Sequence, residues 1–236
     1  MGEVAVVTGA SGALGAEVSR TLARRGHKLA LLDAEVSQQR LVELAASLGA
    51  ACVVAGDLAN ETTWREALPR IERELGAAPT LAALVAGGWR GGRSLHEETN
   101  DDVWRAMLSS NLETVHRGLR ALLPSMVSAK RGSVVVVGSR AVEQPWSSAR
   151  SSAYAATKSA VVVLAQTVAA EVRESGVRIN AILPSTLDTP ANRAAMPNAD
   201  AGRWVSLSSA SAVIAFLLSD DARDISGAAV PVYGRA

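Results

Sequence analysis

The stretch that decides the fold is Val-Ala-Val-Val-Thr-Gly-Ala-Ser-Gly-Ala-Leu-Gly, residues 4–15. Its first five residues are apolar or β-branched, which predicts a buried strand. Glycines at positions 9, 12 and 15 follow immediately, and residues 16–25 then read as a helix. A strand, a glycine-rich turn and a helix in direct succession predict the opening βα unit of a parallel sheet.

The rest of the chain continues this alternation of short apolar runs and longer helical stretches. We expect further strands at residues 29–32, 51–55, 81–86, 133–137, 177–183 and 229–232. Further helices are expected at residues 38–48, 62–75, 101–127, 153–174 and 208–218. Strands that are apolar throughout predict a parallel sheet with helices on both faces. We therefore expect residues 1–236 to form a single doubly wound α/β domain of Rossmann type with a seven-stranded parallel sheet, and a ligand at the carboxyl ends of its strands.

Composition restricts the classes of function open to this chain. Of its 236 residues, 48% are hydrophobic and 20% are charged, and the net charge of +1 favours neither nucleic acid nor an anionic membrane as a partner. The single cysteine, Cys52, permits no internal disulfide, and His27, His96 and His116 lack the spacing of metal ligands. The sequence shows no secretion signal and no apolar run of the ~20 residues that span a membrane. We expect a cytoplasmic protein without a metal ion.

The glycine-rich turn has the residue types that the diphosphate of a dinucleotide requires. Gly9 permits the tight turn out of the strand, Gly12 lets a diphosphate approach the backbone, and Gly15 lets the helix pack closely on the sheet. The free N–H groups at the start of the helix then bind the phosphates. The remaining residues of the turn that we expect to contact the dinucleotide are Ser11, Ala13 and Leu14.

A carboxylate at the end of the second strand predicts which dinucleotide binds. Asp33 lies 18 residues after the last glycine of the turn, close to the ~20 expected of an acid that binds the ribose hydroxyls. It repels a 2′-phosphate, and neither Ser11 nor Ala34 supplies a cation to offset that repulsion. We therefore expect NAD(H) in preference to NADP(H). After the third strand, Asp57 and Leu58 are placed to hold the edge and the face of the adenine.

Tyr154 and Lys158 form the most informative pair in the chain. They stand four residues apart at the start of a long apolar helix, so both side chains share one helix face. A phenol has a reference pKa of ~10, and a neighbouring ammonium stabilises the phenolate and lowers that pKa. We expect an activated tyrosine that protonates a developing alkoxide or deprotonates an alcohol.

Two further polar residues are candidates for the same chemistry. Ser139 follows the fifth strand, where its hydroxyl can bind a substrate carbonyl and steer it toward Tyr154. Asn111 lies inside the long helix expected at residues 101–127, where an asparagine is a modest helix former with an amide to satisfy. Its functional interpretation is a water-mediated link to Lys158 that completes a proton relay. Taken alone, Ser139 also reads as the start of a loop and Asn111 as a surface residue.

With these motifs in this order, the whole chain resembles the short-chain dehydrogenase/reductase family. The four catalytic residues of that family correspond to Asn111, Ser139, Tyr154 and Lys158. The resemblance implies hydride transfer between a nicotinamide and a carbonyl or alcohol carbon, with Tyr154 as the acid and base. The further cofactor residues that it implies are Ala86, Gly87, Pro184 and Leu187, the last two against the nicotinamide, and Thr189, which bonds the carboxamide.

Several loops resemble one branch of this family, the dihydropteridine reductases. The similar segments are Gly12-Ala-Leu-Gly15, Val85-Ala-Gly-Gly-Trp-Arg-Gly-Gly92 and residues 183–193. In such an enzyme Trp89 stacks on a flat pterin ring, although a tryptophan beside glycines can also simply cover the end of a sheet. Dihydropteridine reductases lack the family serine, so Ser139 favours an ordinary ketone or secondary alcohol.

Three functions therefore compete. The leading one is an NAD(H)-dependent oxidoreductase that acts on a small-molecule ketone or secondary alcohol. The second is a quinonoid dihydropteridine reductase that uses NADH, and the third is a sensor that binds NAD and does no chemistry. The complete set of four catalytic residues favours an enzyme. Because residues 153–166 are apolar or small on nearly every helix face, we also expect a homodimer or homotetramer that buries this helix and residues 101–127.

Overall fold

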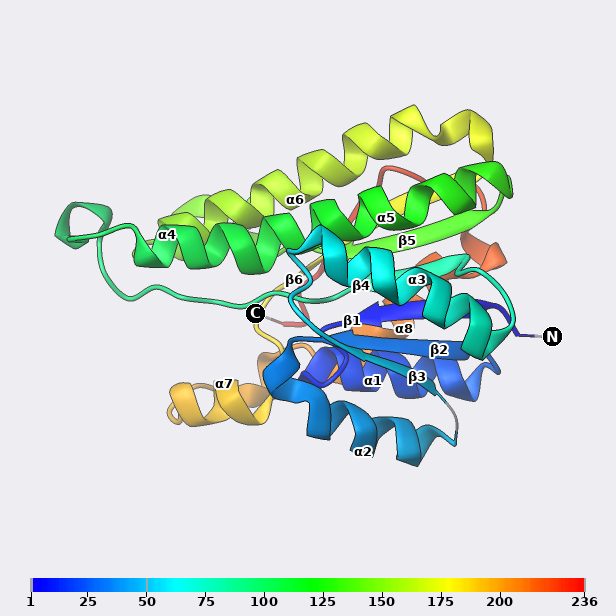
Figure 1. The fold of residues 1–236 in the computed structure, drawn as a ribbon. Coiled ribbons are helices and arrows are strands. Elements are labelled where there is room, and N and C mark those ends of the chain that lie inside the picture. The colour runs from blue at the N-terminus through cyan, green and yellow to red at the C-terminus, as the bar shows by residue number, and fades with distance from the viewer. Residues whose placement is uncertain (1, 50, 236) are drawn as a thin grey trace.

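The computed structural model describes residues 2–49 and 51–235, and it contains one seven-stranded sheet in which every neighbouring pair of strands is parallel (Figure 1). The strand order is β3-β2-β1-β4-β5-β6-β7. The strands are β1 (Val4–Thr8), β2 (Lys28–Asp33), β3 (Ala51–Ala55), β4 (Leu81–Leu84), β5 (Gly132–Val137), β6 (Val177–Pro184) and β7 (Ala229–Val232). The helices are α1 (Ala13–Arg24), α2 (Gln38–Leu48), α3 (Glu61–Leu75), α4 (Asp102–Met107), α5 (Thr114–Ser128), α6 (Ser152–Glu171), α7 (Pro190–Ala195) and α8 (Leu207–Leu218). The predicted parallel α/β fold is confirmed.

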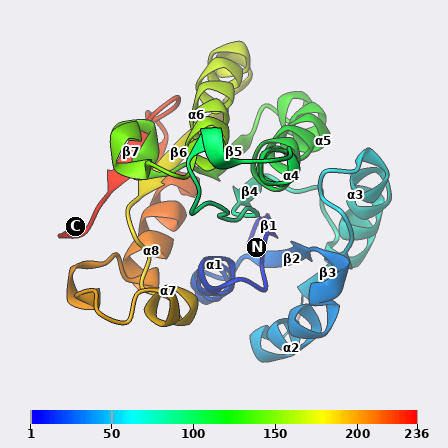
Figure 2. The ribbon, with the colours of Figure 1, turned by 90° about the vertical axis from the view of Figure 1, so that its left-hand side faces the viewer.

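Helices cover both faces of the sheet (Figure 2). Successive strand residues point to opposite faces, so Val6 lies in the core beneath α3, α5 and α6, and Val7 lies in the core beneath α1, α2 and α8. Burial on both faces explains why each strand is apolar throughout. The two halves of the sheet meet where β1 pairs with β4. At such a switch point the carboxyl ends of the strands leave a crevice for a ligand.

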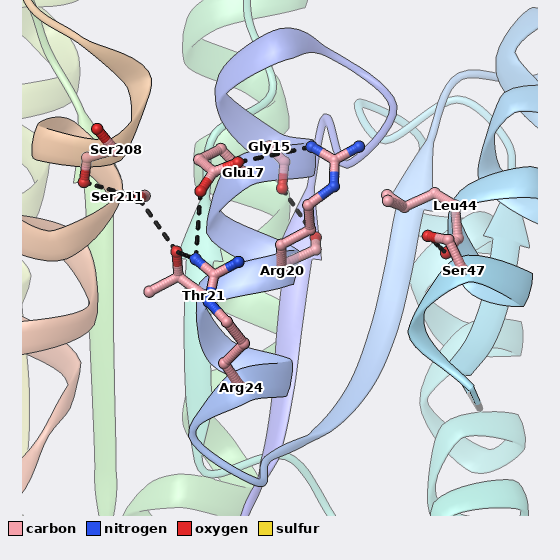
Figure 3. A network of polar contacts seen from close by, with 10 residues as sticks. Gly15, Glu17, Arg20, Thr21, Arg24, Leu44, Ser47, Ser208 and Ser211 are labelled. Carbon is pink, nitrogen blue, oxygen red and sulfur yellow. Dashed lines mark hydrogen bonds and ion pairs between the residues drawn. The ribbon is translucent and has the colours of Figure 1, made fainter.

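Helix α1, which begins at the glycine-rich turn, is held against α8 by a short chain of hydroxyl groups. Thr21 Oγ1 lies 3.2 Å from Ser211 Oγ, and Ser211 Oγ donates to the carbonyl oxygen of Ser208 at 3.0 Å (Figure 3). On the exposed side of α1, Arg24 donates to Glu17 at 3.3 Å. The Thr21–Ser211 contact joins α1 to α8, whereas the Arg24–Glu17 contact lies within α1.

Three segments at the carboxyl end of the sheet differ from the prediction. The helix expected at residues 101–127 is α4 followed by a π-helical segment, Leu108–Glu113, and then α5. The fourth strand ends at Leu84 rather than at residue 86, because the chain leaves the sheet there. Residues 190–195, for which no helix was expected, form the short helix α7, with Thr189 as its cap. Hydrophobic periodicity does not resolve a wider helical turn or a short capped helix on the surface.

Helix α6 has 20 residues and is long and apolar enough, by length and composition, to cross a membrane. It packs against β5 and β6, and it buries the Lys158 side chain. These contacts are those of a helix in the core of the domain, for which such a composition is common.

Candidate active site

One large cleft, with a volume of about 1280 Å³, opens at the carboxyl ends of the strands, the end of the molecule where α4 and α7 lie. Every predicted cofactor and substrate residue lines this cleft. These residues are Gly9, Ser11, Gly12, Ala13, Leu14, Gly15, Asp33, Asp57, Leu58, Ala86, Gly87, Trp89, Ser139, Tyr154, Lys158, Pro184, Leu187 and Thr189. Asn111 is fully buried behind the cleft. The fold therefore gathers side chains from across the sequence into one site.

The glycine-rich turn forms a cradle that leaves no room for a Cβ at Gly9 or Gly15. Gly9 has a φ of +63°, and a Cβ there would lie 2.8 Å from the Cα atom of Ala86. A Cβ on Gly15 would lie 2.1 Å from the carbonyl oxygen of Gly9, so the helix could not approach the turn. Gly12 stands at the N-cap of α1, whose free N–H groups face the cleft. This cradle fits the diphosphate of a dinucleotide.

Ser11 holds the carboxylate of Asp33 at the end of β2. The backbone N–H and the hydroxyl of Ser11 both donate to Asp33 Oδ2, at 2.9 and 2.7 Å, and the N–H of Ala34 donates to Oδ1 at 2.8 Å. The carboxylate is thus fixed where the resemblance places a ribose. Sequence reasoning missed Arg40, which lines the same end of the cleft and donates to Ser37 Oγ at 2.8 Å.

Tyr154 and Lys158 occupy the first two turns of α6 and both face the cleft. Lys158 Nζ donates to the carbonyl oxygen of Val137 at 2.8 Å, and burial lowers the pKa of this lysine to about 8. Burial raises the pKa of Tyr154 above its usual value, while a hydrogen bond with Ser139 acts in the opposite direction. Burial outweighs the Ser139 hydrogen bond, so the pKa of Tyr154 shifts upward, opposite to the lowering by the lysine that we expected.

Asn111 is central to the site although it does not line the cleft. Its Oδ1 accepts a hydrogen bond from the N–H of Gly88 at 2.9 Å, and its Nδ2 donates to Thr157 Oγ1 at 3.3 Å. A Cβ on Gly87 would lie 2.6 Å from Asn111 Oδ1 and 3.2 Å from Lys158 Nζ. The structure thus brings Asn111 and Lys158 together around Gly87, within a π-helical segment of the kind often found at functional sites. Asn111 is therefore buried, whereas its sequence taken alone suggested a surface residue.

Ser139 and Trp89 lie at the end of the cleft that holds Tyr154. The hydroxyl of Ser139 accepts a hydrogen bond from the N–H of Ala141 at 3.2 Å, which orients it at the end of β5. Trp89 lines the cleft with 61% of its surface exposed, so its indole is open to a ligand rather than covering the end of the sheet. The lining residues at this end that sequence reasoning missed are Arg90, Met107, Arg140 and Asn192. The sequence signal that could have identified Arg90 and Arg140 is their position directly after Trp89 and Ser139.

Thr189 makes a hydrogen bond within the protein, in addition to the contact with the nicotinamide carboxamide that the resemblance implies. Its hydroxyl accepts a hydrogen bond from the N–H of Asn192 at 3.1 Å and so caps α7. The hydroxyl proton stays available to a ligand in the cleft. Among the residues that the structure describes, no group of three or more His, Cys, Asp or Glu side chains is placed to hold a metal ion.

Comparison with known proteins identifies the family. A family model described as short chain dehydrogenase matches residues 3–200, and the chain belongs to this family. It is 27% identical over 246 aligned positions to 2,5-dichloro-2,5-cyclohexadiene-1,4-diol dehydrogenase LinX of Sphingobium indicum, covering 99% of this chain and 95% of the relative. It is 33% identical over 192 positions to 2,3-dihydro-2,3-dihydroxybenzoate dehydrogenase of Bacillus subtilis, covering 80% of this chain and 71% of the relative.

A solved structure agrees with this assignment. An oxidoreductase of the short chain dehydrogenase/reductase family from Burkholderia thailandensis matches with a TM-score of 0.86 and 27% identity, covering 99% of this chain and 92% of that one. The protein is therefore an oxidoreductase of a family that uses nicotinamide dinucleotides.

Proposed function

We propose that this protein is an NAD(H)-dependent oxidoreductase that interconverts a ketone and a secondary alcohol, with Tyr154 as acid and base. The observation that carries the proposal is the meeting of Tyr154, Lys158 and Ser139 at one end of a cleft whose other end is the glycine cradle. The bound nicotinamide supplies or accepts the hydride. The residues that would hold it are those of the cradle, Asp33 and the loop Pro184–Thr189.

Each catalytic residue has a distinct task. Tyr154 gives its phenolic proton to the carbonyl oxygen during reduction and takes a proton from the hydroxyl during oxidation. Lys158 presents a cation beside the tyrosine and favours the phenolate once the proton has left. Ser139 donates a hydrogen bond to the same substrate oxygen and fixes the carbonyl in reach of Tyr154. Asn111 acts as a positioning residue, because it links the loop after β4 to α6 through Gly88 and Thr157.

The preference for NAD(H) rests on Asp33. Its carboxylate is held by Ser11 through two hydrogen bonds and faces the cleft, so it can accept from both ribose hydroxyls. A 2′-phosphate at that position would meet a fixed negative charge. Among the described residues that line this end, Arg40 is the one basic side chain, and it already donates to Ser37.

The names of the relatives suggest a class of substrate. Both reported relatives are named as dehydrogenases of diols on six-membered rings. The cleft beside Ser139 offers Trp89, Met107 and Met196 as apolar contacts for such a ring. We therefore propose a cyclic secondary alcohol or the corresponding cyclic ketone as substrate.

A quinonoid dihydropterin is a second candidate. The exposed indole of Trp89 inside the cleft favours it, because a flat pterin ring stacks on an open aromatic face. The hydroxyl of Ser139 favours the ketone instead, since a quinonoid ring needs protonation rather than orientation of a carbonyl.

Oxidation of NADH and of NADPH with cyclohexanone, a 3-oxoacyl thioester and quinonoid dihydropterin distinguishes these functions. We expect NADH to be oxidised with cyclohexanone and NADPH to be used poorly. Turnover of dihydropterin alone would select the second candidate. Binding of NADH without turnover of any compound in the panel would select the sensor.

We further propose that the protein is a homodimer or homotetramer. Val163, in the middle of α6, has 61% of its surface exposed, and Ala156 on the same helix is also exposed. An apolar, small-residue face on a long helix is suited to close packing against the same face of a second copy.

A further inference from the structure

Apart from Arg40, acidic and basic side chains line different halves of the cleft. The acidic residues among the described lining residues are Asp33 and Asp57, and both follow strands of the half of the sheet where the ribose and adenine are expected. The cationic residues near the catalytic tyrosine are Lys158, Arg90 and Arg140. The half of the cleft that receives the substrate is thus lined by three cations and no described acid.

Arg140 is the best placed of these cations for contact with a substrate. It directly follows Ser139 and is half-buried. Its guanidinium makes no hydrogen bond or ion pair with any residue among 2–49 and 51–235. Glu143, the acid nearest to it in sequence, instead accepts a 2.5 Å hydrogen bond from Tyr233 Oη. Within residues 2–49 and 51–235, Glu143 thus makes its hydrogen bond with Tyr233 and not with Arg140.

Arg90 approaches the same end of the cleft from the loop after β4. It directly follows Trp89, and the loop is fixed to the entrance of α6 by a 2.8 Å hydrogen bond from the N–H of Gly92 to the carbonyl oxygen of Arg150. A Cβ on Gly91 would lie 2.8 Å from Ser151 Oγ, so the loop packs tightly there. Within the described chain the guanidinium of Arg90 also has no hydrogen-bonding partner.

We propose that Arg90 and Arg140 form an anion-binding subsite that recognises a carboxylate on the substrate. This inference rests on the proposed function, and it narrows the substrate to a cyclic hydroxy acid or oxo acid. A guanidinium presents a fork of N–H donors that matches a carboxylate, whereas an uncharged substrate would leave the half-buried Arg140 without a partner. Ring contacts from Trp89 and the carboxylate contacts then fix which carbon faces Tyr154.

The reaction balances with these residues. In reduction, a hydride from NADH would add to the carbonyl carbon and a proton would pass from Tyr154 to the oxygen, giving NAD⁺, the secondary hydroxyl and a Tyr154 phenolate. The phenolate then regains its proton from solvent. The carboxylate is unchanged and takes no part in the redox step. Its contribution is binding energy and orientation.

Matched ketones test the subsite. 4-Oxocyclohexanecarboxylate and its methyl ester differ in charge and share the ring. Both are offered with NADH to the wild type and to Arg90→Gln, Arg140→Gln and Arg93→Gln. Arg93 is an exposed arginine on the same loop that does not line the cleft, so Arg93→Gln is the matched control.

We expect the wild type to prefer the acid over the ester by about 10- to 100-fold in kcat/KM, the range that one hydrogen bond between charged groups supplies. Arg90→Gln and Arg140→Gln should each reduce that preference mainly through KM for the acid, while rates on the ester and the binding of NADH stay within about twofold. Arg93→Gln should leave both substrates unchanged. Three results would overturn the subsite. They are equal rates on acid and ester in the wild type, equal losses on both substrates in the variants, and weakened NADH binding in Arg90→Gln or Arg140→Gln.

A binding measurement separates this proposal from the proposed function. Cyclohexanecarboxylate cannot be reduced, and its binding to the complex with NADH is followed by calorimetry, with cyclohexanemethanol as the neutral control. Binding that depends on Arg90 and Arg140 supports the subsite even if no ketone turns over, in which case only the proposed function fails. Equal binding of the acid and the alcohol overturns the subsite even if both ketones are reduced.

Discussion

The side-chain nitrogen of Lys158 donates a 2.8 Å hydrogen bond to the main-chain oxygen of Val137, the last residue of β5. Ser139 follows two residues later, so this bond joins helix α6, which carries Tyr154, to the strand end that carries the serine. The lysine is also buried, and burial lowers its pKa to about 8. The site therefore holds a cation in a fixed place, at a cost in stability near neutral pH.

The substitution Lys158→Met removes that buried charge at nearly constant volume. The pKa of this lysine is 10.5 as a reference value and about 8 in the folded protein. Between these values the unfolded chain binds more protons than the folded one, so the lysine makes the stability of the wild type rise with pH across this window. We expect the free energy of unfolding of the wild type, relative to the variant, to rise by roughly 3 kcal/mol from about pH 7 to about pH 11. Urea unfolding at a series of pH values measures this; a difference that is constant or falls would contradict it.

Gly87 and Gly88 are a matched pair of positions at which the close approach of Asn111 to the loop after β4 can be tested. A Cβ on Gly87 would lie 2.6 Å from Asn111 Oδ1, whereas a Cβ on Gly88 would meet nothing within 4 Å. We expect Gly87→Ala to lower the free energy of unfolding by about 1–3 kcal/mol through overcrowding. Gly88→Ala should change it by no more than about 0.5 kcal/mol. Two variants of equal stability, compared by urea unfolding, would show that Asn111 is not packed against this loop.

The cofactor preference depends on the charge at the end of β2. In Asp33→Ser the fixed carboxylate is gone, and we expect the ratio of kcat/KM for NADH to that for NADPH to fall by about tenfold or more. Arg40, which lines the same end of the cleft, is the cation that we expect to meet a 2′-phosphate in this variant. Adding Arg40→Ala to Asp33→Ser should therefore raise KM for NADPH again. An unchanged cofactor ratio in Asp33→Ser would remove the role given to this aspartate.

The fold was predictable because its local signals agree. The glycine-rich turn specifies a βα unit, and uniformly apolar strands such as Val134–Val137 require burial on both faces. The glycines of the turn and Asp33 were predictable from spacing, since the carboxyl ends of parallel strands meet at one edge of the sheet, whereas Pro184, Leu187 and Thr189 were expected only from the family resemblance.

Features that depend on contacts across the sequence could not be predicted. Asn111 lies in the π-helical segment and makes its side-chain hydrogen bonds with Gly88 and Thr157, which are remote in sequence. The raised pKa of Tyr154 follows from burial that periodicity does not quantify. Arg140 was missed because its place in the wall of the cleft follows from the fold and not from a motif of its own.

Substitution of Val163, which is exposed on α6, tests the proposed assembly. We expect light scattering at micromolar concentration to give a dimer or a tetramer for the wild type. Val163→Arg should shift this to a smaller species, because a charge would be buried in the interface. Val42→Arg is the control, since Val42 is 52% exposed on α2, which covers the opposite face of the sheet. A monomeric wild type would refute the proposed assembly.

Tyr154→Phe tests the central claim most directly, because it removes one hydroxyl and keeps the ring that lines the cleft. Cyclohexanone reduction by NADH and the dissociation constant for NADH are measured for the variant and the wild type. If Tyr154 is the proton donor, kcat should fall by at least about 100-fold, while the dissociation constant for NADH changes by less than about twofold. Full ketone reduction by Tyr154→Phe would contradict the mechanism.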